Sequence, residues 1–128
     1  MTYLPHRLSR PSYRPVRFPP MARPLPKKDH KIAPHEAARL IKAHRHKAAA
    51  TSTSAAPVLC FHRQAFERIL KQPGCSGIRL YPALHDDGSQ TLVLVGINAE
   101  GCDMHEGEFA QDPVECPPDC DPTSPLVT

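Results

Sequence analysis

The distribution of proline limits what this chain can fold into more than any other feature. Eight of its sixteen prolines lie in the first 34 residues. Each proline removes a backbone hydrogen-bond donor and keeps the residue before it out of the helical region. Large apolar residues are sparse there and follow no period, so little surface is available to offset the entropy of ordering. We therefore expect residues 1–32 to be disordered with polyproline II character.

Charge is distributed as unevenly as proline. Residues 1–47 hold twelve Lys or Arg and two acidic residues, a net charge of +10. Residues 48–98 are close to neutral at +1, and residues 99–128 hold eight acidic residues and no Lys or Arg. The 128 residues allow one domain at most. The sequence thus predicts a basic arm, a nearly neutral body and an acidic tail.

A helix is predicted between the arm and the body. Pro34 and Glu36 are typical of a first helical turn, where proline is tolerated and a carboxylate faces the positive end of the helix dipole. The apolar stripe of this helix is thin, so we expect it to dock weakly or only on a partner. Its basic residues are candidate contacts for nucleic acid or an acidic partner: Arg39, Lys42, Arg45 and Lys47.

The body has the strongest secondary-structure signals. Residues 61–72 carry apolar side chains on one helical stripe, and Pro73-Gly74 ends that helix. Residues 77–81 alternate as a strand, Asp86-Asp87-Gly88-Ser89 indicates a hairpin turn, and residues 91–97 form the strongest strand. A short third strand is expected within residues 102–109.

These signals predict an α+β fold with a small helix and a β-hairpin, or a three-stranded meander, as its core. The predicted organisation is a disordered basic arm (1–32), a basic helix (33–50), a linker (51–57), a small α+β core (58–109) and an acidic tail rich in Cys and Pro (110–128).

The strand at residues 91–97 is apolar on both faces, which is typical of a strand buried on both sides. The short helix at residues 61–72 can cover only one of them. Pro82 places the partner strand at a sheet edge or ends its pairing. The second face then requires either a homodimer, which we favour slightly, or the helix at residues 33–50 folding back.

Three segments carry a resemblance to known proteins. They are Gln72-Pro73-Gly74-Cys75 running into Gly77-Ile78-Arg79-Leu80-Tyr81-Pro82-Ala83, then Thr91-Leu92-Val93-Leu94-Val95-Gly96, then Cys116-Pro117-Pro118-Asp119-Cys120. Together they resemble a group of small uncharacterised bacterial proteins over roughly residues 58–120. The resemblance implies a bacterial setting and no particular activity.

Five cysteines are the main candidates for chemistry. Cys116 and Cys120, with Cys102 and His105, have ligand types and spacings that fit a tetrahedral zinc site. A disulfide between Cys116 and Cys120 and incidental thiols in a mobile tail are the alternatives. The N-terminus lacks the apolar segment of a signal peptide, and no apolar run reaches the length of a membrane span. We therefore expect a cytoplasmic protein without a membrane partner.

Three functions follow from these observations. Because no phosphate-binding loop, zinc-protease motif or nucleophile elbow occurs in the sequence, we favour a non-enzymatic binding or regulatory module that acts through protein contacts. The first alternative is RNA or DNA binding through residues 1–47, which would release counterions from the phosphates. The second alternative is a zinc or thiol-redox protein that uses the C-terminal cysteines.

Overall fold

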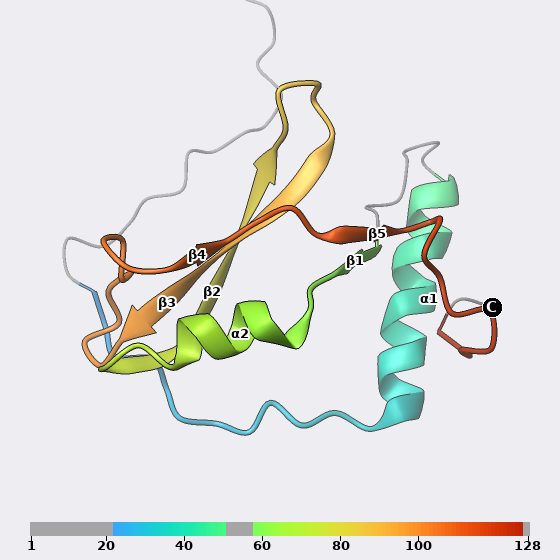
Figure 1. The fold of residues 1–128 in the computed structure, drawn as a ribbon. Coiled ribbons are helices and arrows are strands. Elements are labelled where there is room, and N and C mark those ends of the chain that lie inside the picture. The colour runs from blue at the N-terminus through green and yellow to red at the C-terminus, as the bar shows by residue number, and fades with distance from the viewer. Residues whose placement is uncertain (1–21, 51–57, 127–128) are drawn as a thin grey trace, which may run out of the picture.

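The computed structural model describes residues 22–50 and 58–126, and the ranges 1–21, 51–57 and 127–128 lie outside this description. The predicted linker and most of the predicted disordered arm therefore lie outside the described residues. The elements are α1 (Pro34–Ala50), β1 (Val58–Cys60), α2 (Arg63–Leu70), β2 (Cys75–Leu84), β3 (Gln90–Asn98), β4 (Phe109–Ala110) and β5 (Val114–Cys116). The α+β prediction is confirmed, and Figure 1 shows α2 lying across the sheet while α1 stands to one side.

The centre of the fold is an antiparallel meander in the order β2-β3-β4. The hairpin between β2 and β3 pairs Leu84 with Gln90 at its turn, where the carboxylate of Asp87 accepts hydrogen bonds from Ser89 N at 2.9 Å and Ser89 Oγ at 2.6 Å. These bonds lower the pKa of Asp87. The turn predicted from residues 86–89 is thus present, and both strands are longer than the alternating residues alone indicated.

Pro82 lies within β2, which is an edge strand, as its presence predicted. On the β4 side of β3, Asn98 N donates to Cys102 O at 2.9 Å, and Met104 N donates to Gly96 O at 2.8 Å. Backbone groups alternate between the two neighbours of a strand, so the odd-numbered residues of β3 bond to β2. Pro82 pairs with the even-numbered Leu92, and its missing N–H would therefore point to the open edge.

Helix α2 is shorter than the predicted span of 61–72. His62 has an extended backbone, and its Nδ1 accepts a hydrogen bond from Gln64 N at 3.1 Å, so the helix begins at Arg63. The third strand is also shorter than expected. Only Phe109–Ala110 pairs with β3 as a strand, and Asp103 forms an isolated bridge with Ile97.

The side of the sheet that contacts α2, which we call the helix face, holds the apolar core. Ile69 of α2 and Leu94 of β3 are fully buried, and Ala110 joins them. Phe61 and Phe66 pack at the edge of this cluster with their rings edge to face, 6.3 Å between centroids. This packing is what the apolar stripe of the helix predicted.

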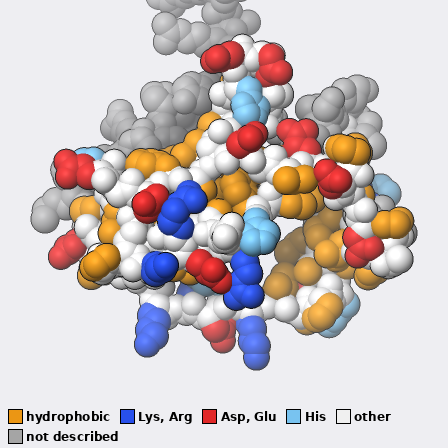
Figure 2. Space-filling model, in the orientation of Figure 1, with side chains coloured by type: hydrophobic (Ala, Val, Ile, Leu, Met, Phe, Trp, Pro, Cys, Tyr) orange, Lys and Arg blue, Asp and Glu red, His pale blue; other side chains and the backbone are white. Residues whose placement is uncertain are grey.

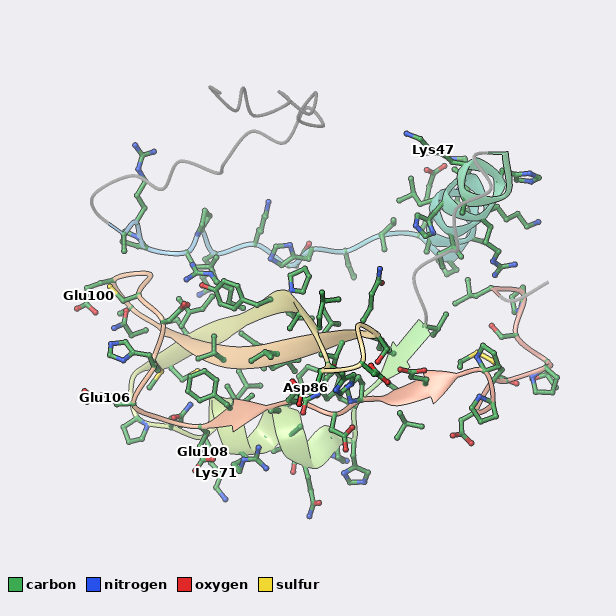
Figure 3. The ribbon with its side chains drawn as sticks, turned by 90° about the horizontal axis from the view of Figure 1, so that it is seen from above. Lys47, Lys71, Asp86, Glu100, Glu106 and Glu108 are labelled. Carbon is green, nitrogen blue, oxygen red and sulfur yellow. A yellow bond between two sulfur atoms is a disulfide. The ribbon has the colours of Figure 1, made fainter. Side chains whose placement is uncertain are left out.

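The other side of the sheet, which we call the opposite face, is covered in an unexpected way. Residues 22–33, which we call the crossing segment, run in an extended path along the side away from α2 (Figure 3). The segment lies so close that a Cβ at Gly77 would be 2.9 Å from Leu25 Cδ2, and one at Gly101 would collide with the backbone of Arg23. Gly101 also has a φ of +86°, which favours glycine.

This path bears on two predictions, the disordered arm and the cover of the second face. The part of the proposed disordered arm that the structure describes, residues 22–32, has a defined course along the sheet. The segment lies beside Gly77 of β2 and Gly101 on the second face, and α1 stands to one side instead of folding back over it (Figure 1). The homodimer stays a prediction. A basic chain with four Lys or Arg in residues 22–33 was not expected to run along a sheet, and its apolar side chains Leu25 and Ile32 remain 44% and 53% exposed.

The predicted acidic tail also takes part in the fold. Its proposed start at residue 110 falls inside β4, and β5 pairs antiparallel with β1 in a separate two-stranded ribbon. Val58 lies opposite Cys116, and Cys60 lies opposite Val114. The C-terminal end is therefore not disordered as a whole, and the core extends at least to Cys116.

Candidate functional site

An apolar groove lies between β1 and the turn end of the hairpin. Its volume is about 500 Å³, and it is lined by Leu59, Pro82, Ala83, Leu84, Gln90, Thr91 and Leu92. None of these residues is charged. The hydroxyl of Thr91 is buried and accepts a hydrogen bond from Gln111 Nε2 at 3.0 Å, so this polar group is already satisfied. The groove is therefore suited to an apolar ligand surface.

The groove exists because α2 covers only part of the helix face. Leu80 and Leu84 alternate with their neighbours on β2 to point to this face, yet they are 51% and 69% exposed. Val58 of β1 is 55% exposed nearby in the β1–β5 ribbon. Figure 2 shows hydrophobic side chains reaching the surface among charged ones on this side of the molecule. Apolar side chains therefore remain exposed beyond the region that α2 covers.

A polar cluster lies on the opposite face. Asp103 Oδ1 is 2.5 Å from Arg79 Nη1, and Tyr81 OH donates to Asp103 Oδ2 at 2.5 Å. Arg79 also donates to the carbonyl of Gly101 at 3.4 Å. Arg79 and Tyr81 come from β2, whereas Asp103 lies beyond β3, so these side chains reach across β3.

The cluster raises the pKa of two of its groups, Tyr81 and Arg79. The hydrogen bond to Asp103 is the largest cause of a raised pKa of Tyr81, because ionisation of the phenol would break it and place two negative charges together. Partial burial works against the charge of Arg79, but its hydrogen bond and attraction to Asp103 outweigh this and raise its pKa. With all three groups engaged with one another, the cluster joins β2 to the loop after β3.

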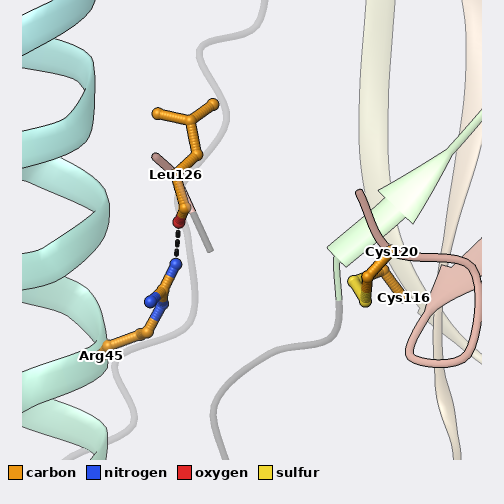
Figure 4. Close-up of a disulfide and its surroundings, with 4 residues drawn as sticks. All are labelled: Arg45, Cys116, Cys120 and Leu126. Atoms are coloured by element: carbon orange, nitrogen blue, oxygen red, sulfur yellow. Dashed lines mark hydrogen bonds between the residues drawn. A yellow bond between two sulfur atoms is a disulfide. The ribbon is translucent and has the colours of Figure 1, made fainter. Parts of the chain in front are cut away.

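The predicted basic contacts lie on α1, and none of them lines the groove. Arg39 pairs with Glu36 at 2.8 Å, and Arg45 donates to the carbonyl of Leu126 (Figure 4). Lys42 is exposed on the same helix, and Lys47 lies near its C-terminal end (Figure 3). The Arg45 contact joins the basic helix to the C-terminal segment. Whether these four residues contact nucleic acid or an acidic partner stays a prediction.

The structure does not bring the four predicted zinc ligands together. Cys116 and Cys120 form a disulfide, one of the alternatives that the sequence left open (Figure 4). Cys102 and His105 lie in the segment after β3, at the end of the molecule away from β5 (Figure 1). Within residues 22–50 and 58–126, no group of three or more His, Cys, Asp or Glu side chains is arranged to hold a metal ion.

Comparison with known protein families, with curated proteins and with solved structures finds no match in any of the three. The resemblance to small bacterial proteins therefore stays a prediction. No helix in the described part of the chain is long and apolar enough to cross a membrane.

Two features of the site were missed from the sequence. The groove depends on β1, whose three residues are too short to give a strand signal, and on its pairing with β5. The Arg79–Tyr81–Asp103 cluster depends on the bridge between Ile97 and Asp103. Arg79 and Tyr81 alternate on one face, which was a visible signal, but nothing in the sequence placed Asp103 opposite them.

Proposed function

We propose that this protein is a small non-enzymatic binding module that docks an apolar, uncharged segment of a partner protein in the groove between β1 and the hairpin. The observation that carries this proposal is the groove itself, about 500 Å³ and lined without any charged side chain. Exposed apolar surface gathered beside a groove is typical of an interaction site, whereas single exposed apolar residues are ordinary.

The chemistry of the lining favours one kind of occupant. A charged side chain would lose its hydration on entering this groove without gaining an ion pair. An apolar side chain would bury itself against Leu84 and Leu92, each of which gains by leaving water. Gln90 at the rim retains an amide that can orient a backbone group of the partner. The occupant is therefore expected to be a short segment rich in Leu, Ile, Val or Phe.

Substitution of Leu84 tests this proposal. Peptides selected from a displayed library on the full chain should be enriched in uncharged apolar residues, and Leu84→Asp should weaken their binding at least tenfold, as measured by fluorescence polarisation. The matched control is Leu70→Asp, because Leu70 is also exposed but lies at the end of α2, outside the groove. Circular dichroism should show that both variants are folded.

Three outcomes would contradict the proposal. The library could yield no apolar sequences, or the two variants could weaken binding equally. A third contrary result is a dimer in analytical ultracentrifugation that Leu84→Asp dissociates, because the groove would then serve self-association.

We further propose a cytoplasmic setting for this module. Three cysteines of the chain are free thiols, and those of Cys60 and Cys102 are exposed. Exposed free thiols are maintained in reducing compartments, which supports this setting.

A further inference from the structure

The disulfide at the end of β5 has one sheltered sulfur and one accessible one. Cys116 is the last residue of β5 and is buried, whereas Cys120 is exposed. Only three residues separate the two, and their Cα atoms are 4.8 Å apart. A nucleophile from solution can therefore reach Cys120, while Cys116 is protected by the ribbon.

Two observations favour an exchangeable disulfide over a purely structural one. The stabilisation from a disulfide grows with the length of the loop that it closes, and this loop is very short. The same chain also keeps the exposed thiols of Cys60 and Cys102 free. Where exposed thiols persist, a disulfide in the same chain is more typically a redox-active one than a permanent link.

The backbone holds the two sulfurs near each other without help from the disulfide. Asp119 N donates to Glu115 O at 3.1 Å, and Cys120 N donates to Pro118 O at 3.0 Å. Cys116 is also held in register opposite Val58. The reduced thiols would thus remain close, so the bond can form again without refolding the chain.

We propose that Cys116–Cys120 is a reversible thiol–disulfide exchange site whose substrate is a dithiol, such as the reduced active site of a protein reductase. This goes beyond the proposed binding function and does not depend on it. One thiolate of the dithiol attacks Cys120 Sγ and forms a mixed disulfide, while the Cys116–Cys120 bond breaks and Cys116 leaves as a thiolate that takes a proton from water. The second thiolate of the dithiol then attacks the dithiol sulfur that is bonded to Cys120. The mixed disulfide breaks, and Cys120 leaves as a thiolate that takes a proton from water. The dithiol is oxidised to a disulfide as this protein gains two thiols.

We expect two carboxylates to influence the balance between the two states. Glu115 and Asp119 lie within one residue of Cys116 and Cys120 in the sequence. Their negative charge disfavours thiolates by Coulomb repulsion and therefore favours the disulfide wherever the thiols would ionise. Removing the two charges should make the disulfide easier to reduce at a pH near the ordinary thiol pKa. At a pH well below that value it should have little effect.

The experiment equilibrates the full chain with graded ratios of reduced and oxidised dithiothreitol, traps thiols by alkylation, and counts the labels by intact mass. We expect two thiols to appear together in one two-electron transition, with an unchanged circular dichroism spectrum. The Glu115→Gln/Asp119→Asn double variant should shift the equilibrium constant roughly twofold toward reduction at about pH 8.5 and not at about pH 6. Cys102→Ser, which removes an exposed thiol elsewhere, should leave the transition unchanged.

Cys60→Ser tests the nearest other thiol. Cys60 and Cys116 are diagonal neighbours in the β1–β5 ribbon, and such Cα atoms lie about 7–8 Å apart, beyond the usual reach of a disulfide. The transition should therefore persist in this variant. A disulfide that resists dithiothreitol until the protein unfolds, or a fold that melts on reduction, would overturn the proposal. So would a transition lost in Cys60→Ser or a double variant that shifts nothing at about pH 8.5.

Discussion

The two faces of the β2–β3 hairpin are buried to the same degree at their centres but by different means. Leu94 on the helix face has no exposed surface, and Val95 on the opposite face is 1% exposed. Leu94 is covered by the apolar side chains of α2. Val95 pairs with Arg79 of the polar cluster, and the crossing segment, residues 22–33, runs along the same side of the sheet (Figure 3).

This difference shows what alternation in a strand does and does not predict. Apolar residues on both faces of β3 correctly indicated two-sided burial, because exposed apolar surface on a central strand is costly. The pattern contained no information on which part of the chain packs against each face. A helix supplies its own apolar stripe, whereas the opposite face carries the Arg79–Asp103 ion pair and an extended segment that leaves a cavity of about 570 Å³ between itself and the start of β2.

The largest expected effect comes from truncating the centre of the helix face. Leu94→Ala should lower the free energy of unfolding by about 2–5 kcal/mol, since it opens a cavity beneath Ile69 in a fully buried position. Urea denaturation followed by circular dichroism measures the change.

Val95→Ala is the matched variant for the opposite face, at an equally buried neighbouring position. It should cost clearly less than Leu94→Ala, because it removes fewer carbons and because extended chain can settle into the space more easily than a helix. Equal losses at the two positions would mean that the opposite face is packed as rigidly as the helix face.

A smaller effect on the free energy of unfolding is expected from disrupting the Arg79–Tyr81–Asp103 cluster. Asp103→Asn removes the ion pair with Arg79 and the charged acceptor of Tyr81. Because both side chains are partly exposed, the loss should be about 1 kcal/mol of unfolding free energy. Glu106→Gln, a change at an exposed carboxylate of the same segment (Figure 3), is the control and should leave stability unchanged.

The same variant has a signature in pH. The pKa of Tyr81 is raised in the folded chain, so its contribution to stability is complete below the ordinary tyrosine pKa of about 10 and is lost as the pH rises through the raised value. In Asp103→Asn the pKa of Tyr81 should fall toward the ordinary value. Ultraviolet titration of tyrosinate, assigned with Tyr81→Phe, measures this shift, and an unchanged titration would show that Asp103 does not hold the phenol.

The elements predicted from the sequence were those with local causes. The hairpin follows from the turn at Asp86–Ser89 and from alternation in β3, and α2 follows from its apolar stripe and Pro73. The helix α1 was also predicted nearly to its observed bounds, because its alanines and its proline start act within one or two turns. Each signal depends on neighbours in the sequence.

The parts that were missed depend on contacts between distant residues. The β1–β5 ribbon pairs residues 58–60 with residues 114–116, and neither strand is long enough to show a period. The crossing segment is placed by the space that Gly77 and Gly101 leave for Leu25 and Arg23. The groove depends on the β1–β5 ribbon, so it was missed altogether, whereas Cys116 and Cys120 could be named from the sequence as a possible disulfide but not placed in the fold.

The smallest expected effect concerns α1, which belongs to neither face. Arg45 donates a hydrogen bond to the carbonyl of Leu126, and this is an exposed contact at the end of the described chain. Arg45→Ala should therefore change the free energy of unfolding by less than about 0.5 kcal/mol in urea denaturation. Because α1 keeps its own backbone hydrogen bonds, its helical signal should remain. A loss of unfolding free energy as large as that of Asp103→Asn would show that α1 is coupled to the stability of the sheet. The hairpin would then depend on α1 as well as on α2 and the crossing segment.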